Sequence, residues 1–179
     1  MVYVFLADGF EEVEALTAVD VLRRAGVDVK TVSIQEGPVV SGAHGIDVHA
    51  DLMFSNCNFN EANMLVLPGG LPGSTNLLAH QGLKEQLLDF AKKGKNIAAI
   101  CAAPMVLGAH GILKGKKATI YPGIEDKLIG AIPTGEAVTV DGNIITGMGP
   151  AKAMEFALAL LMQLKGENIR NQIAAELLY

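Results

Sequence analysis

Cysteine is scarce in this sequence: Cys57 and Cys101 are the only two among 179 residues. They form no Cys-x-x-Cys motif, and two cysteines do not make the disulfide framework of a small secreted domain. We therefore expect free thiols and a cytoplasmic protein. No histidine, cysteine and acidic residues have the spacing of a known metal site, so the sequence predicts no metal.

Long apolar runs and clusters of basic residues are also missing. The longest apolar runs, such as "IAAICAAPMVL", fall short of the ~18 residues that a membrane-spanning helix needs. The first residues, "MVYVFLADGF", lack the basic start of a signal peptide. The net charge of -5 is spread along the chain without a Lys/Arg cluster. We therefore expect neither a membrane nor a nucleic acid among the partners.

Hydrophobic residues are abundant and make up half of the chain. Short apolar runs alternate with segments of helical periodicity, and no linker, repeat or low-complexity tract interrupts them. This alternation favours a mostly parallel sheet with helices on both faces, so we expect one α/β domain over residues 1–179. The predicted strands are 2–7, 28–34, 62–70, 96–100 and 117–121, with hairpins within 38–52 and 137–146; helices are predicted at 11–25, 81–95, after Cys101, and at 123–129, 150–166 and 167–178.

Cys101 lies where the predicted strand "NIAAI" gives way to a helix. Ligands of parallel α/β sheets bind beyond the carboxyl ends of the strands, so the thiol stands at the edge where a site is expected. The helix start favours a thiolate and predicts a pKa below the ordinary value of about 8.5, while the small Ala102 and Ala103 leave the sulfur accessible. The alternative is an unreactive core cysteine. Cys57, in the loop "SNCNFN", has no comparable setting.

Glu14 occupies an unusual position in the predicted helix 11–25. Glu11 and Glu12 are ordinary acids for a first helical turn, but the residues that share a face with Glu14 are all apolar. A buried carboxyl has a raised pKa, and in its protonated form it can donate a hydrogen bond. We therefore expect a protonated Glu14 to donate to the thiolate of Cys101. The alternative is an exposed helix acid.

A glycine loop, "VLPGGLPGS", follows the predicted strand 62–70. Its glycines allow successive N–H groups to turn inward and bind an anion. Close to Cys101, the N–H groups of Gly70 and Ala102 would form an oxyanion hole for a carbonyl under attack. The loop could equally turn the chain or hold a phosphate, although it matches neither GxGxxG nor the Walker A pattern.

Together, "ADGFEEVEA", "VLPGG", "AAICAAP" and "GMGPAKAMEFALAL" resemble the ThiJ/PfpI superfamily, in particular its DJ-1-like branch, over nearly the whole chain. The resemblance implies a flavodoxin-like three-layer sandwich that forms a homodimer. It also implies that Cys101 is the reactive, oxidisable cysteine and Glu14 its protonated partner. Gly70 and Ala102 then supply the backbone N–H groups.

The resemblance also places Gly69, Tyr121 and Gly149 around the pocket. Tyr121 stands where several members with glyoxalase activity carry a histidine, and a phenol with a pKa near 10 is a poor base at neutral pH. The peptidase branch has a histidine directly after its cysteine, where this chain has Ala102, and the His-x-Glu of class I amidotransferases is absent. Neither activity is expected, and the four histidines suggest no catalytic triad.

For function, the resemblance implies a cysteine-dependent, cofactor-independent stress-response protein of the glyoxalase or deglycase type. Its substrates would be small dicarbonyls such as methylglyoxal, or their adducts. The alternative is a non-enzymatic oxidative-stress sensor or redox-regulated chaperone that responds through oxidation of Cys101. Apolar residues almost all round the predicted helix 11–25 also favour a homodimer, because one face can cover the sheet while another meets a partner.

Overall fold

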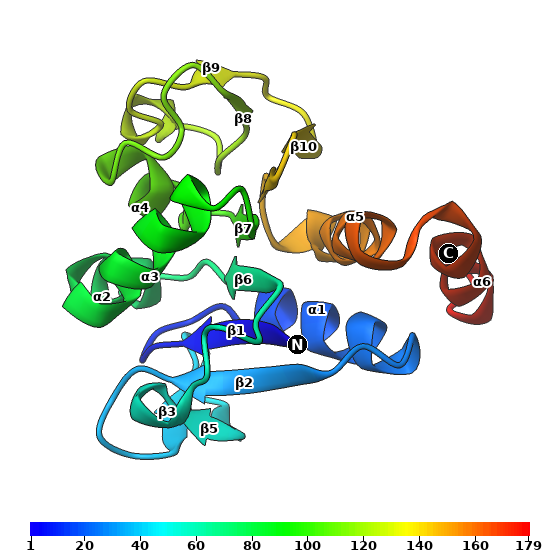
Figure 1. Ribbon diagram of the computed structural model, residues 1–179, viewed down its shortest axis with the longest axis horizontal. Helices are drawn as coiled ribbons and strands as arrows, with labels where there is room; N and C mark the ends of the chain where they lie inside the picture. The colour runs from blue at the N-terminus through cyan, green and yellow to red at the C-terminus, as the bar shows by residue number, and fades with distance from the viewer.

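A seven-stranded sheet forms the middle of the molecule, with helices on both of its faces (Figure 1). The computed structural model describes residues 1–179. The strand order is β10-β11-β7-β6-β1-β2-β5, and every neighbouring pair is parallel except the β10–β11 hairpin at one edge. This is the flavodoxin-like α/β sandwich that the sequence predicts.

The elements have the following bounds. The main sheet contains β1 (Val2–Leu6), β2 (Val29–Ser33), β5 (Leu52–Met53), β6 (Met64–Leu67), β7 (Asn96–Ile100), β10 (Val138–Asp141) and β11 (Ile144–Gly147). Two small sheets contain β3 (Val39–Ser41) with β4 (Asp47–His49), and β8 (Lys117–Ala118) with β9 (Ile132–Pro133). The α-helices are α1 (Glu12–Arg24), α2 (Gly73–Ala79), α3 (Gln81–Lys92), α4 (Pro104–Ala109), α5 (Ala153–Lys165) and α6 (Glu167–Glu176), with 3-10 turns at Phe54–Asn56, Glu125–Lys127 and Pro150–Lys152.

The two faces of the sheet bury separate cores. In β1, Val2, Val4 and Leu6 belong to the core shared with α1 and α5, whereas Tyr3 and Phe5 belong to the core under α3 and α4. This alternation follows from the two-residue period of a strand. Because helices cover both faces, the whole of β1 is buried and reads as one continuous apolar run. The alternation of strands and helices along the chain thus packs into three layers.

The segment 117–121 differs from its prediction. Only Lys117–Ala118 is a strand, and it pairs with β9 outside the main sheet. The β10–β11 hairpin occupies the edge of the main sheet. The backbone amides of the segment 117–121 therefore bond to side chains of this hairpin: Lys117 N–H donates to the Asp141 carboxylate and Thr119 N–H donates to Thr146 Oγ1. The predicted helix 123–129 is likewise reduced to a single 3-10 turn.

Two other elements are missing from the sequence prediction. The hairpin within 38–52 forms as β3–β4, but Leu52–Met53 leaves it and joins the main sheet beside β2. Helix α2 follows the glycine loop, in a segment for which the sequence predicts no helix. No helix of the molecule combines the length and the apolar character that crossing a bilayer requires.

Candidate active site at Cys101

Cys101 lies in a tight turn between β7 and α4, with its backbone in the left-handed region at φ 62°. For a residue other than glycine, this conformation costs on the order of 1–3 kcal/mol and is concentrated at functional sites. Cys101 N–H donates to the Gly147 carbonyl and Tyr121 N–H donates to the Cys101 carbonyl, both at 2.9 Å. Pro104 begins α4, where its missing N–H costs little. The turn therefore presents the half-buried thiol to a pocket.

Glu14 comes from α1 and is only 1% exposed. Its Oε2 accepts a hydrogen bond of 2.8 Å from the Gly69 N–H. Its Oε1 is buried and has no hydrogen-bond partner of ordinary geometry, although the carboxyl and the Cys101 thiol lie close enough to shift each other's pKa. The prediction of a buried carboxyl beside the thiol is therefore confirmed, and the exposed alternative is wrong.

Burial raises the pKa of Glu14 to about 7, and the charge of Glu11 adds to this rise. The hydrogen bond from Gly69 and the interaction with Cys101 act in the opposite direction but are outweighed. At neutral pH the carboxyl is therefore protonated in about half of the molecules. A group that changes its protonation near pH 7 is suited to move protons during a reaction.

The thiol does not follow the sequence prediction of a lowered pKa. Burial, and after it the charge of the neighbouring Glu14 carboxylate, raise the pKa of Cys101 to about 12. The amides of Gly70 and Ala102 lower the pKa but do not compensate. The contribution of Glu14 belongs to its ionised form, so it vanishes when Glu14 takes up a proton. Burial still raises the pKa of the thiol in that form, so the sulfur keeps its proton at neutral pH.

The glycine loop holds this pair together. A Cβ at Gly69 would lie 2.5 Å from the Cys101 Cβ and 2.6 Å from Glu14 Oε2, so no larger residue fits between them. Gly70 has φ 87°, and a Cβ there would lie 2.5 Å from the Glu11 nitrogen. The amides of Gly70 and Ala102 both interact with the Cys101 sulfur. The glycine loop and the cysteine turn therefore each supply one N–H group to the position that the sequence assigns to an oxyanion hole.

The thiol opens into a pocket of about 370 Å³ whose wall includes Gly70, Ala102 and Tyr121. Tyr121 is about half exposed and belongs to this wall. Gly149 lines a neighbouring cavity that shares Tyr121 and Pro122 with the first, and Gly69 lines neither cavity but donates a hydrogen bond to Glu14. Four of the predicted residues therefore line one pocket: Gly70, Cys101, Ala102 and Tyr121. Glu14 and Gly69 lie next to the cysteine, and Gly149 lines the neighbouring cavity.

Sequence reasoning missed part of the pocket wall. Leu71 lines it directly after the glycine loop, and Pro122, Gly123 and Ile124 line it directly after Tyr121. The signal for these residues was their place in the chain, immediately following positions already assigned to the site. No histidine lines the pocket, so Glu14 is the one carboxyl or imidazole beside the thiol. The grouping with metal-ligand chemistry lies elsewhere, at Glu11, Glu12 and His44.

Comparison with known proteins gives this site a context. The DJ-1/PfpI family model matches residues 1–163. Protein DJ-1 homolog A of Arabidopsis thaliana is 38% identical over 97% of this chain, but the chain spans less than half (45%) of that relative. A protein of Pyrococcus abyssi named as a deglycase is 37% identical over 83% of this chain and 90% of its own length.

A solved structure extends the likeness to three dimensions. DJ-1 of Toxoplasma gondii, in an oxidized form, superposes with a TM-score of 0.95 and 38% identity. The superposition covers 99% of this chain and 97% of that one. Glu14 and Cys101 both fall within residues 1–163. The strained cysteine turn and its buried acid therefore belong to the part of the chain that matches the family model. The chain belongs to the DJ-1/PfpI family.

Proposed function

We propose that this protein is a cysteine-dependent, cofactor-independent enzyme of the glyoxalase or deglycase type, which acts on small dicarbonyls such as methylglyoxal or on their adducts. The observation that carries the proposal is the Cys101 thiol in an open pocket, in contact with a buried carboxyl whose pKa is about 7. The name of the Pyrococcus relative, a deglycase, supports the same reaction class.

In the first step, the Cys101 sulfur adds to the aldehyde carbon while Glu14 accepts the thiol proton. The electron pair of the C=O double bond moves to the oxygen, where the amides of Gly70 and Ala102 stabilise the negative charge. Glu14 then returns its proton to that oxygen, which gives a neutral hemithioacetal. The raised pKa of Glu14 suits this exchange, since a carboxyl near pH 7 both accepts and donates protons readily.

In the second step, Glu14 removes the hydrogen of the former aldehyde carbon as a proton and passes it to the ketone oxygen, which gives an enediol. Glu14 then takes the hydroxyl proton of the first carbon and delivers a proton to the second carbon. The first carbon becomes a thioester and the second an alcohol, so one carbon is oxidised while the other is reduced. Water then hydrolyses the thioester, which releases the hydroxy acid and the thiol. Because oxidation and reduction balance within the substrate, the reaction needs no redox cofactor. No histidine lines the pocket, so Glu14 carries every proton transfer.

The decisive experiment is an incubation with methylglyoxal followed by measurement of lactate. We expect lactate from the parent protein and none from Cys101→Ser, whereas Cys57→Ser should retain the activity because Cys57 lies outside the pocket. Glu14→Gln should lower kcat by at least about 100-fold, the usual contribution of a general acid–base residue. Lactate formation by Cys101→Ser, or none by the parent protein, would refute the enzymatic proposal.

A second function, oxidative sensing, is favoured by one feature of the site. Peroxide converts a thiolate to sulfenic and then sulfinic acid. A protonated Glu14 could donate a hydrogen bond to the sulfinate, and its pKa of about 7 keeps that proton available. Intact mass measurement after peroxide treatment should then show two added oxygens on the parent protein and none on Cys101→Ser. Ready oxidation without lactate formation would favour a redox sensor or redox-regulated chaperone over the enzyme.

We also propose a homodimer in a reducing compartment such as the cytoplasm. Both cysteines are free thiols. On α1, Val13 is 52% exposed and Leu16 is 37% exposed, which leaves an apolar strip of the helix uncovered by this chain.

A further inference from the structure

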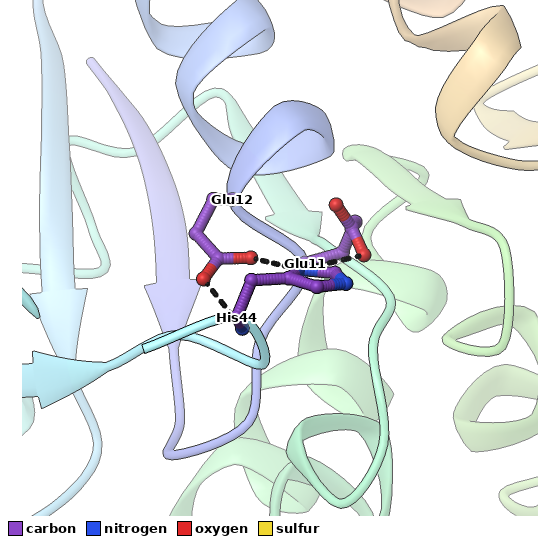
Figure 2. A group of neighbouring side chains, drawn as sticks. All are labelled: Glu11, Glu12 and His44. Carbon is purple, nitrogen blue, oxygen red and sulfur yellow. Dashed lines mark hydrogen bonds and ion pairs between the residues drawn. The ribbon is translucent and has the colours of Figure 1, made fainter. Parts of the chain in front are cut away.

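A second cluster of titratable side chains lies at the start of α1, and none of its members lines the pocket at Cys101. Glu11 and Glu12 come from the beginning of the helix, and His44 comes from the loop between β3 and β4, 32 residues beyond Glu12. One ligand-type atom of each residue lies within 4.8 Å of the others. Figure 2 shows the His44 ring between the two carboxylates. We refer to these three residues as the Glu-Glu-His cluster.

The spacing of the cluster is close to that of a metal coordination sphere. His44 Nδ1 is 2.8 Å from Glu12 Oε2 and 3.7 Å from Glu11 Oε2. A four-coordinate zinc ion with ligand bonds of about 2.0–2.2 Å holds neighbouring ligand atoms roughly 3.3 Å apart. Each of these two separations lies within about 0.5 Å of that value, and the third, between the two carboxylates, is no more than 4.8 Å. A rotation of the Glu11 side chain, which makes no hydrogen bond, would bring the two carboxylates closer together.

The backbone around the cluster is already fixed. Glu12 is 4% exposed, and its Oε1 accepts a hydrogen bond of 2.7 Å from the His44 amide, which ties the hairpin loop to the helix. Gly42 makes this approach possible, because a Cβ there would overlap the Glu12 carboxylate. Glu11 N–H donates to the Gly69 carbonyl at 2.9 Å. Ligands held this way need little reorganisation to bind an ion.

The Glu11 carboxylate supplies an independent reason to expect a cation. Its side chain is only 14% exposed, yet it makes no hydrogen bond and pairs with no lysine or arginine. Glu12 is hydrogen-bonded by the amide and the ring of His44 but likewise has no lysine or arginine partner, so two carboxylates face a single imidazole. For Glu11, a largely buried carboxylate without a hydrogen bond is unfavourable. A divalent ion would neutralise both charges, and the exposed side of His44 leaves a path for it to enter.

We propose that the Glu-Glu-His cluster binds one divalent first-row transition-metal ion such as Zn²⁺ through Glu11 Oε2, Glu12 Oε2 and His44 Nδ1, with water at the open positions. One imidazole and two carboxylates suit these ions, whereas Mg²⁺ and Ca²⁺ prefer oxygen ligands alone. The proposal departs from the sequence prediction of no metal. The spacing of these three residues along the sequence does not indicate a metal site, because the hairpin brings His44 to the helix only in the folded chain.

Zinc titration by calorimetry tests the proposal on tag-free protein in which Cys57 and Cys101 are both replaced by serine, so that thiols cannot bind the metal. We expect one equivalent of Zn²⁺ per chain. His44→Ala and Glu11→Gln should each weaken the binding at least 10-fold. His49→Ala is the matched control, because His49 is an exposed histidine on the same hairpin outside the cluster, and its affinity should stay within twofold.

Fold and ligation are measured separately. Glu11→Gln removes a carboxylate that makes no hydrogen bond, so its melting temperature should equal that of the parent. With Co²⁺ as a probe, the visible absorption of a bound ion should appear in the parent and in His49→Ala but not in His44→Ala. The proposal is wrong if Zn²⁺ does not bind below 1 mM, or if affinity persists within twofold in both His44→Ala and Glu11→Gln.

Discussion

Replacing Glu14 by glutamine should remove a pH dependence of folding that the buried carboxyl creates. The folded pKa of about 7 lies above the ordinary value of 4.5, so the folded protein keeps a proton that the unfolded chain releases between these values. The stabilising effect of this proton is complete below about pH 4.5 and is lost as the pH rises through about 7. The parent protein should therefore become less stable from pH 5 to pH 7.5.

The expected loss follows from the two pKa values. At about 1.36 kcal/mol per pH unit, the full interval between 4.5 and about 7 corresponds to roughly 3.4 kcal/mol. From pH 5 to pH 7.5, most of this interval is crossed, which gives about 2 kcal/mol for this one group. Glutamine carries no charge at any of these pH values, and its side-chain oxygen can still accept the hydrogen bond from Gly69.

Urea unfolding at intervals between pH 5 and pH 7.5 measures the effect. The free energy of unfolding of the parent should fall by about 2 kcal/mol relative to Glu14→Gln as the pH rises. Glu136→Gln, at an exposed position, is the control and should run parallel to the parent. A constant difference between the parent and Glu14→Gln over this range would refute the reasoning, because it would mean that Glu14 titrates alike in the folded and unfolded states.

Three further predictions concern the pocket and the surface. Gly69→Ala should lower the free energy of unfolding by about 1–3 kcal/mol, since its Cβ overlaps Cys101 and Glu14; an unchanged thermal melt would contradict this. Tyr121→His should raise kcat/KM for methylglyoxal about 10-fold at pH 7.5, because an imidazole is a better base than a phenol there; equal or lower turnover by the variant would argue against it. Light scattering should give twice the 18.8 kDa mass of the chain at micromolar concentration, and Val13→Glu on the exposed face of α1 should give the single mass; a monomeric parent protein would remove the prediction.

Much of the fold was predictable because local patterns encode it. The apolar run 96–100 indicates a buried strand that ends where a helix begins. The structure has strand β7 there, followed by helix α4, which begins at Pro104. The apolar residues that share a helix face with Glu14 likewise indicated that its side chain would be buried, and it is. The segment 117–121 failed for a tertiary reason: it has the pattern of a strand, but the β10–β11 hairpin already fills the sheet edge that it would need.

The sequence by itself determined the layered architecture and the kinds of side chain that stand where strands end, because hydrophobic period and turn residues act over a few neighbouring positions. Tertiary structure alone decided the electrostatics. Whether the thiol of Cys101 loses its proton easily depends on how deeply it is buried and on the charge of Glu14, and the structure reverses the expected direction of its pKa. The meeting of His44 with Glu11 and Glu12 is of the same kind. Burial and charge act through space between segments that are distant in the chain, and no local pattern records those distances.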